Sequence, residues 1–137
     1  MDFRPPNTNG NYINFVIAGG YPRLFYASAN KMTSSATLTA NTWHHVALTR
    51  DISTDPDTMR IYLDGVKTAQ ITENVDFLTG TDRPVIAGLG YNTGLTGYSF
   101  KGYIQDLRYS GKARYTLDDH SPSSSASVKI PDAPLKG

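Results

Sequence analysis

The chain contains no cysteine, a single glutamate and no long apolar run. The absence of cysteine excludes disulfides and thiolate metal sites, but it leaves the compartment open. No apolar stretch approaches the ~18 residues that a spanning helix needs. The first ten residues also lack the apolar core of a secretory signal peptide. We therefore expect no membrane partner.

Charge is also scarce, at 18% of residues with a net charge of +1. The Lys and Arg residues are scattered, whereas a nucleic-acid partner requires a stripe of positive charge facing the phosphates. We therefore expect no nucleic-acid partner. Nine Tyr and five Phe accompany many Thr, Ser, Asn and Gly residues. These residue types favour strands and turns over helices.

Turn-forming residues recur at short intervals and separate stretches that favour strands. The expected strands cover residues 12–18, 23–29, 43–50, 59–63, 66–72, 84–89 and 100–109. Short strands at this spacing are typical of a β-sandwich or barrel. No segment has a 3.6-residue period, so we expect almost no helix. A length of 137 residues suits one domain.

The clearest local prediction is a hairpin around Asp64-Gly65, because a two-residue type I′ turn favours this pair. Residues 59, 61 and 63 are apolar and predict a buried face, while Arg60 and Tyr62 are placed on a wetter face. In residues 43–50 both alternating faces carry bulky side chains. This strand is therefore expected in the middle of a sheet.

Three stretches follow one ordered pattern, at residues 41–50, 59–65 and 100–109. They contain a Trp-x-His-Val-Ala strand, an aromatic-x-Asp-Gly hairpin and a Phe-x-Gly-x-Ile-x-Asp-hydrophobic-Arg strand. Together they resemble the concanavalin A-like, laminin G-like superfamily. The resemblance implies an all-β, two-sheet antiparallel jelly-roll sandwich over residues 1–116. The polar residues 117–137 are expected to form an extended C-terminal arm.

Several residues acquire structural roles from this resemblance. Trp43 is expected to fill space between the sheets, and Gly102 to permit a close backbone approach. Asp106 is expected to cap the chain locally or to pair with Arg108. The ending at residues 113–116, Ala-Arg-Tyr-Thr, looks like that of versions found in tailed-phage structural proteins.

The chain departs from the family pattern at its beginning, where an additional strand or two usually precedes the segment that residues 2–5 resemble. In the family the missing strand lies beside the one that corresponds to residues 100–109. An uncovered edge there invites pairing with another chain. We expect a neighbouring subunit, or residues 121–137, to cover it. A shortened sheet that stays uncovered is the alternative.

Enzymatic chemistry is not expected. Glycoside hydrolysis needs two closely placed carboxylates, and the enzymes of this superfamily carry a Glu-x-Asp-x-x-Glu strand. Glu73 is the only glutamate in the chain, so that motif is excluded. His44 and His45 are adjacent on a strand and point to opposite faces, so they cannot share one metal. We expect one of them buried with a hydrogen bond and the other at the surface.

Two loops are candidate binding sites. Asp51, Asp55 and Asp57 crowd one loop, where clustered oxygens suit calcium, but the spacing is not that of an EF-hand and Asx-turns explain the same residues. We therefore expect no metal or other cofactor. The glycine-rich residues 88–97 form the better candidate, for a sugar. Its ligand-binding residues would be Tyr91, Asn92, Thr93 and Tyr98, which supply flat rings, an amide and hydroxyls.

Two functions follow from these observations. The first is a non-catalytic virion structural or interaction module, such as part of a phage tail fibre, baseplate or capsid decoration. Its partners would be other virion subunits or further copies of itself, with a trimer as one form, and its location the virion. The alternative is a monomeric carbohydrate-binding, lectin-like domain, secreted or at the cell surface, whose partner is a cell-surface glycan.

Overall fold

The computed structural model describes residues 1–3, 5, 10–78, 86, 99–111 and 113, and these residues form strands and no helix. No helix able to cross a membrane therefore occurs among them. The strands are β1 (Asn14–Ala18), β2 (Tyr21–Tyr26), β3 (Ala29–Thr33), β4 (Val46–Asp51), β5 (Thr58–Leu63) and β6 (Val66–Thr72). The all-β prediction is confirmed.

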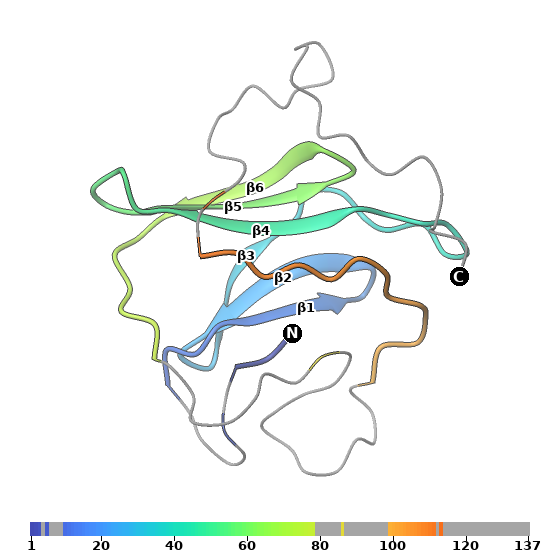
Figure 1. The fold of residues 1–137 in the computed structure, drawn as a ribbon, viewed down its shortest axis with the longest axis horizontal. Coiled ribbons are helices and arrows are strands. Elements are labelled where there is room, and N and C mark those ends of the chain that lie inside the picture. The colour runs from blue at the N-terminus through green and yellow to red at the C-terminus, as the bar shows by residue number, and fades with distance from the viewer. Residues whose placement is uncertain (4, 6–9, 79–85, 87–98, 112, 114–137) are drawn as a thin grey trace.

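The strands form two antiparallel sheets that lie face to face (Figure 1). Sheet A has the order β1-β2-β3 and sheet B the order β4-β5-β6. Three connections are two-residue turns in which both residues have positive φ, at Gly19-Gly20, Ala27-Ser28 and Asp64-Gly65. Such turns match the right-handed twist of the strands. The hairpin predicted at Asp64-Gly65 is confirmed, since Leu63 pairs with Val66.

The turn at Ala27-Ser28 separates β2 from β3, which the sequence did not reveal. The strand expected at residues 23–29 runs through this turn. Alanine and serine are not the residues that usually accept positive φ, so no turn signal marks the boundary. The exposed residues of β3 also give little alternation to recognise.

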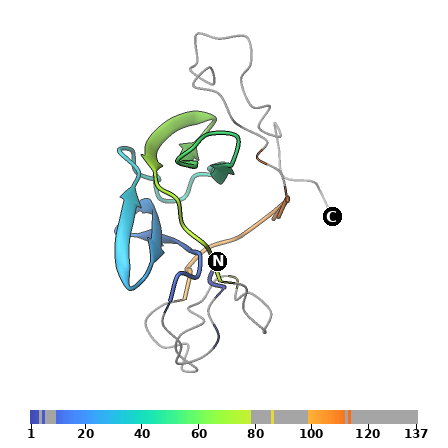
Figure 2. The ribbon, with the colours of Figure 1, turned by 90° about the vertical axis from the view of Figure 1, so that its left-hand side faces the viewer.

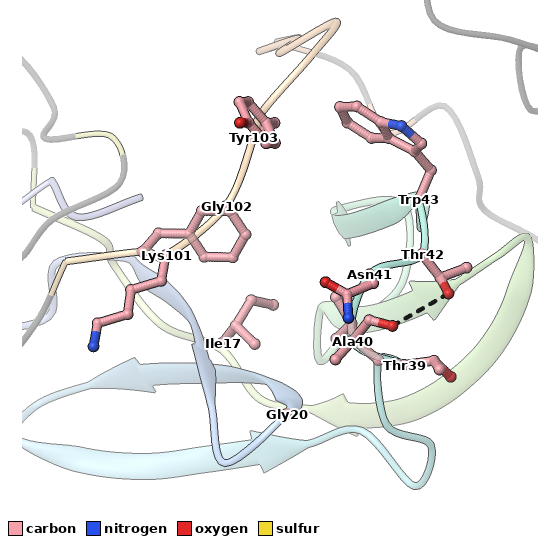
Figure 3. Close-up of a pocket in the computed structure, with 12 residues that line it drawn as sticks. Ile17, Gly20, Thr39, Ala40, Asn41, Thr42, Trp43, Lys101, Gly102 and Tyr103 are labelled. Carbon is pink, nitrogen blue, oxygen red and sulfur yellow. Dashed lines mark hydrogen bonds between the residues drawn. The ribbon is translucent and has the colours of Figure 1, made fainter.

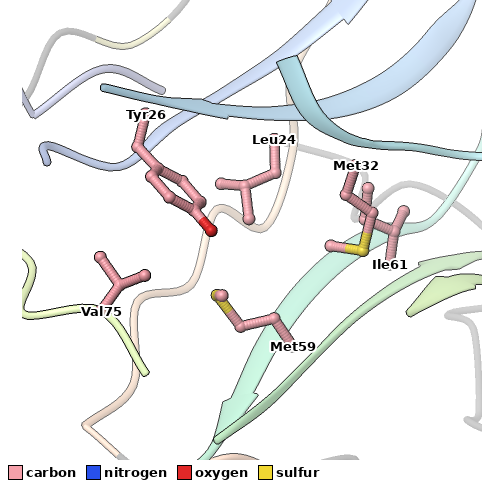
Figure 4. Close-up of a cluster of buried hydrophobic side chains, with 6 residues drawn as sticks. All are labelled: Leu24, Tyr26, Met32, Met59, Ile61 and Val75. Carbon is pink, nitrogen blue, oxygen red and sulfur yellow. The ribbon is translucent and has the colours of Figure 1, made fainter. Parts of the chain in front are cut away.

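The hydrophobic core lies between the two sheets (Figure 4). Leu24 and Met32 extend from sheet A toward Met59 and Ile61 of sheet B. Leu24 and Met32 are cross-strand partners, and Met59 and Ile61 are two residues apart on β5, so each pair lies on one face of its sheet. The predicted buried face of residues 59, 61 and 63 is confirmed, because all three are buried. The fold class is thus a two-sheet sandwich, consistent with a jelly roll.

Three predictions about this sandwich are wrong. Arg60 and Tyr62 are buried and do not form a wetter face, and the Arg60 guanidinium lies 3.7 Å from the Asp51 carboxylate, which compensates its charge. Within the described residues β4 lies at the edge of sheet B, not in the middle. Trp43 does not fill the space between the sheets. It precedes β4, which begins at Val46, so strand alternation does not extend to it.

The segment of residues 99–111 also differs from its prediction. It forms no ladder with any described residue, and it runs along one side of the sandwich between the levels of the two sheets (orange in Figures 1 and 2). Asp106 turns the chain with a φ of 53°, and no ion pair joins it to Arg108 in this described segment. A bend at this position interrupts the extended backbone that a strand requires. The strand expected at residues 84–89 lies outside the described residues, apart from Ile86.

Residues 1–3 pair with the edge of β1 that faces away from β2. The Phe15 amide donates to the Met1 carbonyl at 2.8 Å, and the Phe3 amide donates to the Ile13 carbonyl at 3.0 Å. The Phe3 and Tyr109 rings lie 5.7 Å apart between centroids. The 99–111 segment therefore passes beside the start of the chain, without strand pairing among the described residues. The arm expected over residues 117–137 lies outside the described residues.

A polar contact joins the two sheets at one end of the core. The buried Tyr26 hydroxyl, on β2, donates to a carboxylate oxygen of Glu73, which follows β6. Lys31 of β3 lies 3.7 Å from the other carboxylate oxygen and 4.9 Å from the centre of the Tyr26 ring. Both carboxylate oxygens of Glu73, the only glutamate of the chain, thus contact residues of sheet A.

Candidate functional site

A cleft of about 690 Å³ opens between the loop of residues 38–43 and the segment of residues 100–103. We call it the aromatic cleft. Its floor reaches the β1–β2 hairpin at Ile17 and Gly20 (Figure 3). The loop precedes β4 of sheet B, while the hairpin belongs to sheet A. The β1–β2 hairpin, the loop before β4 and the 99–111 segment therefore contribute to the cleft, which only the folded chain assembles.

Aromatic rings line the mouth of the cleft. Trp43 is 56% exposed and Tyr103 is 87% exposed, and they extend from opposite walls at the same end of the cleft (Figure 3). Phe100 lies further along the 99–111 segment wall. A Cβ atom at Gly102 would come within 2.9 Å of the Phe100 ring. The absence of a side chain at Gly102 therefore leaves room for the Phe100 ring. The sequence had instead suggested the close approach of another backbone segment.

Polar groups stand beside these rings. Thr39, Asn41 and Thr42 line the loop wall, and the Thr42 hydroxyl lies 3.5 Å from the Ala40 carbonyl (Figure 3). Asn41 has a φ of 59°, a left-handed conformation that asparagine accepts more readily than most residues. Lys101 also lines the cleft, with its ammonium group turned away from Trp43 (Figure 3). The cleft thus combines exposed rings with amide and hydroxyl groups.

His44 and Asp64 hold the loop of the cleft in place. The Thr39 amide donates to His44 Nε2 at 2.8 Å, so Nε2 carries no proton. His44 Nδ1 therefore carries the proton and donates to Asp64 Oδ2 at 2.7 Å. The other carboxylate oxygen of Asp64 accepts the His45 amide at 2.9 Å. One turn residue of the β5–β6 hairpin thus fixes the end of the loop.

The two histidines behave in part as expected. The side chain of His44 is 11% exposed and hydrogen-bonded at both nitrogens, so it is satisfied as expected, although the residue is half-buried and not fully buried. His45 is half-buried rather than at the surface. Burial lowers the pKa of His45 below its ordinary value of 6.5, although the Asp64 carboxylate opposes this.

The three aspartates of the β4–β5 loop have protein partners. Asp51 Oδ1 accepts from the Ser53 amide and hydroxyl, at 3.0 and 2.6 Å. Asp57 accepts from Arg50 Nε at 2.7 Å, and Asp55 accepts from the Asn74 amide at 2.7 Å. The Asp51 contact is an Asx-turn, as the sequence suggested, whereas Asp55 and Asp57 are held by side chains from elsewhere in the fold. Across the described residues no cluster of three or more His, Asp or Glu side chains forms a metal-binding group.

The residues expected to bind sugar, Tyr91, Asn92, Thr93 and Tyr98, lie outside the described residues. The residues that line the aromatic cleft were not predicted as a site. Residues 40–42 were interpreted only as a turn, and Trp43 only as core. Phe100 and Tyr103 were assigned to a strand. One signal for this site was available before folding, the tripeptide Asn41-Thr42-Trp43, which places an amide, a hydroxyl and a ring in consecutive loop positions.

Comparison with known proteins gives one result. A family model described as the concanavalin A-like lectin/glucanases superfamily matches residues 3–116. No curated protein and no solved structure shows a significant match. The matched range covers both sheets, the loop of residues 38–43 and the 99–111 segment.

Proposed function

The chain belongs to the concanavalin A-like lectin/glucanase superfamily, and from this premise we propose that it is a non-catalytic carbohydrate-binding domain whose site is the aromatic cleft. The family supports a lectin-like domain at the level of the fold. Because one fold hosts many functions, the proposal depends on the cleft itself. Its main support is the exposure of Trp43 and Tyr103 beside loop amide and hydroxyl groups.

The chemistry of the cleft suits a sugar. A sugar ring presents a weakly polar C–H face that packs against a flat aromatic ring, while its hydroxyls need hydrogen-bonding partners at the edge. Trp43 and Tyr103 offer the rings, and Asn41 offers an amide that both donates and accepts. A volume of about 690 Å³ lies within the ~300–1,000 Å³ range of small-molecule sites.

The described part of the cleft lining contains no acidic side chain, which favours binding without hydrolysis. The described residues that line it include neither Asp nor Glu, whereas glycoside hydrolysis uses two carboxylates a few ångströms apart. Glu73 is engaged by Tyr26 at the end of the core. These residues support a binding role, and incubation of the purified chain with a polysaccharide panel should release no reducing ends.

The binding function can be tested with a panel of methyl glycosides and oligosaccharides. Replacement of Trp43 by Ala, or of Tyr103 by Ala, should weaken binding by roughly 10-fold because a stacked ring is lost. Isothermal titration calorimetry with the best-binding member measures the change. Tyr109→Ala is the matched control, because Tyr109 is also exposed but does not line the cleft.

The variants distinguish the cleft from other sites. Equal affinity in the wild type, Trp43→Ala and Tyr103→Ala would exclude the cleft as the binding site. Tyr91→Ala tests the site that the sequence alone suggests, and loss of binding in that variant only would transfer the function to residues 91–98. Failure of every glycan in the panel to bind the wild type would refute the carbohydrate-binding proposal.

We infer a second candidate function, a structural module of a virion that docks with other subunits or with copies of itself. The observation that favours it is a row of exposed apolar side chains on the 99–111 segment, namely Phe100, Tyr103, Ile104, Leu107 and Tyr109. Contiguous exposed apolar surface often marks a protein interface. Light scattering gives the mass in solution. A trimer or another stable oligomer supports this function, and a strict monomer at high concentration argues against it.

A further inference from the structure

We propose that His44 is a positioning residue of the aromatic cleft, which holds residues 39–43 of the loop in place when neutral and releases them when protonated. This inference rests on the function proposed above, because the loop carries Asn41, Thr42 and Trp43. Its consequence is that ligand binding by the cleft weakens in acid.

The argument begins with the proton positions on His44. A backbone amide can only donate, so the contact of 2.8 Å from the Thr39 amide requires a lone pair on Nε2. The carboxylate of Asp64 can only accept, so the contact of 2.7 Å requires a proton on Nδ1. These two partners define one neutral tautomer. The imidazole links the Asp64 turn to the loop through opposite edges of its ring.

The loop has few other attachments. Within the described part of the chain, the Leu38 amide, at the first residue of the loop, donates to the Gly20 carbonyl at 2.9 Å. The next contact is that of Thr39 with His44, and Thr42 bonds only inside the loop. The His45 amide is then held by Asp64 just after the loop. The Thr39 contact is therefore the hydrogen bond that ties residues 39–43 to a side chain outside the loop.

Protonation affects only one of the two contacts of His44. A second proton would be added at Nε2, which would then face the Thr39 amide donor to donor. The Nδ1 contact with Asp64 would remain, since a carboxylate accepts from the charged ring as well. The His44 side chain is 11% exposed and the Thr39 contact lies at the surface, so water can take up both donors once they separate. The loop backbone must therefore move away from the ring.

The charged surroundings of His44 come from three elements. Asp64 contacts it from the β5–β6 turn, and His45 is its neighbour in sequence. Lys101 faces the same cleft from the 99–111 segment. Of these groups only Asp64 contacts the His44 ring, and His45 is a second imidazole that must be removed from the experiment.

The first experiment needs no ligand. Amide exchange of Thr39 is followed by NMR between pH 8 and 5 in a His45→Gln background, with exchange corrected for its intrinsic pH dependence. We expect the protection of Thr39 to fall roughly 10-fold in acid while core amides such as Ile61 stay protected. In His44→Gln the amide oxygen accepts in place of Nε2 and does not titrate, so protection should be independent of pH.

The second experiment measures binding of the best methyl glycoside over the same pH range. The affinity should fall roughly 3- to 10-fold in the His45→Gln protein and stay constant when His44→Gln is added. Asp64→Asn is an independent variant, because asparagine also accepts positive φ but cannot accept from both His44 and His45. One of these two bonds must fail in that variant, so the loop should be loosened already at pH 8.

The outcomes separate the two proposals. Protection of Thr39 that does not change with pH overturns the positioning role of His44, whatever the glycan results. Protection that changes while no glycan binds at any pH supports the positioning role and refutes carbohydrate binding. Binding that weakens equally in His44→Gln assigns the pH dependence to another group and also overturns the inference.

Discussion

At the scale of single residues, the chain uses its few acidic side chains as hydrogen-bond acceptors inside the fold. Glu73 accepts from Tyr26, Asp51 accepts from Ser53, and Asp64 accepts from His44 and His45. A carboxylate accepts several hydrogen bonds and strengthens each by its charge. For Asp51 these hydrogen bonds lower the pKa of the carboxyl group, so its contribution to stability should depend on pH.

Tyr26→Phe should lower the free energy of unfolding by about 1 kcal/mol at pH 7, because one buried hydrogen bond to a charged group is lost. Burial raises the pKa of Tyr26 above its ordinary value of 10.0. The hydrogen bond to Glu73 and the negative charge of Glu73 raise this pKa further. Its stabilisation is therefore complete below pH 10 and decreases above it, as the unfolded chain loses this proton first. Urea unfolding from pH 7 to 11 should show a weaker alkaline loss in the variant. An unchanged alkaline slope would contradict this assignment.

Ser53→Ala should raise the pKa of Asp51 toward its ordinary value of 3.8. The hydrogen bonds from the Ser53 hydroxyl and amide lower this pKa in the folded protein. The lowered pKa stabilises the fold above pH 3.8, and this stabilisation is lost as the pH falls below that value. The variant should be less stable at neutral pH and lose less on acidification. A carboxyl-carbon NMR titration measures the pKa, and an unchanged value would show that Ser53 is not its cause.

At the scale of elements, the three two-residue turns differ in how well their residues suit positive φ. Gly19-Gly20 and Asp64-Gly65 suit it, whereas Ala27-Ser28 adopts φ values of 49° and 59° with ordinary side chains. Outside glycine and asparagine, the left-handed conformation carries a steric penalty. Sheet A therefore contains one hairpin that its own sequence favours only weakly.

Changing Ala27-Ser28 to Asn-Gly should stabilise the protein by about 1 kcal/mol, because this pair is preferred in type I′ turns. The neighbouring pairs Tyr26–Ala29 and Phe25–Asn30 should keep their register. Chemical denaturation measures the gain. The matched control is Gly65→Ala, which places a side chain at a φ of 82° and should destabilise the other hairpin. A loss of stability in the Asn-Gly variant would show that the turn is not strained as argued.

At the scale of the whole molecule, burial separates the residues that hold the sandwich together from those that form the cleft. Ile61 is fully buried between the sheets, while Trp43 lies at the mouth of the cleft and contributes little to the core. Stability and binding should therefore respond to different substitutions. This separation is what a scaffold with a site in its loops requires.

Ile61→Ala should reduce the free energy of unfolding by about 2–5 kcal/mol, because it leaves a cavity at the centre of the core. Trp43→Ala should change it by less than about 1 kcal/mol, since the ring is already largely in water. Thermal and urea unfolding of both variants measure the difference. A large loss in Trp43→Ala would show that this ring packs as core, as its sequence position first suggested.

The sequence alone determined the local structure. The turn at Asp64-Gly65 and the alternation of residues 59, 61 and 63 were sufficient to place β5 and β6, because turn chemistry and strand period act over a few residues. The fold family was also recognisable, since its motifs occur in order along the chain. The boundary between β2 and β3 was missed because Ala27-Ser28 carries no turn signal.

Only the tertiary structure decided how distant segments meet. The exposure of Trp43, the aromatic cleft and the proton positions on His44 depend on contacts between residues far apart, such as His44 and Asp64, which are separated by 20 positions. No local period encodes such contacts, because they arise from the packing of one sheet and one loop against another. The fold could therefore be predicted, and the candidate site could not.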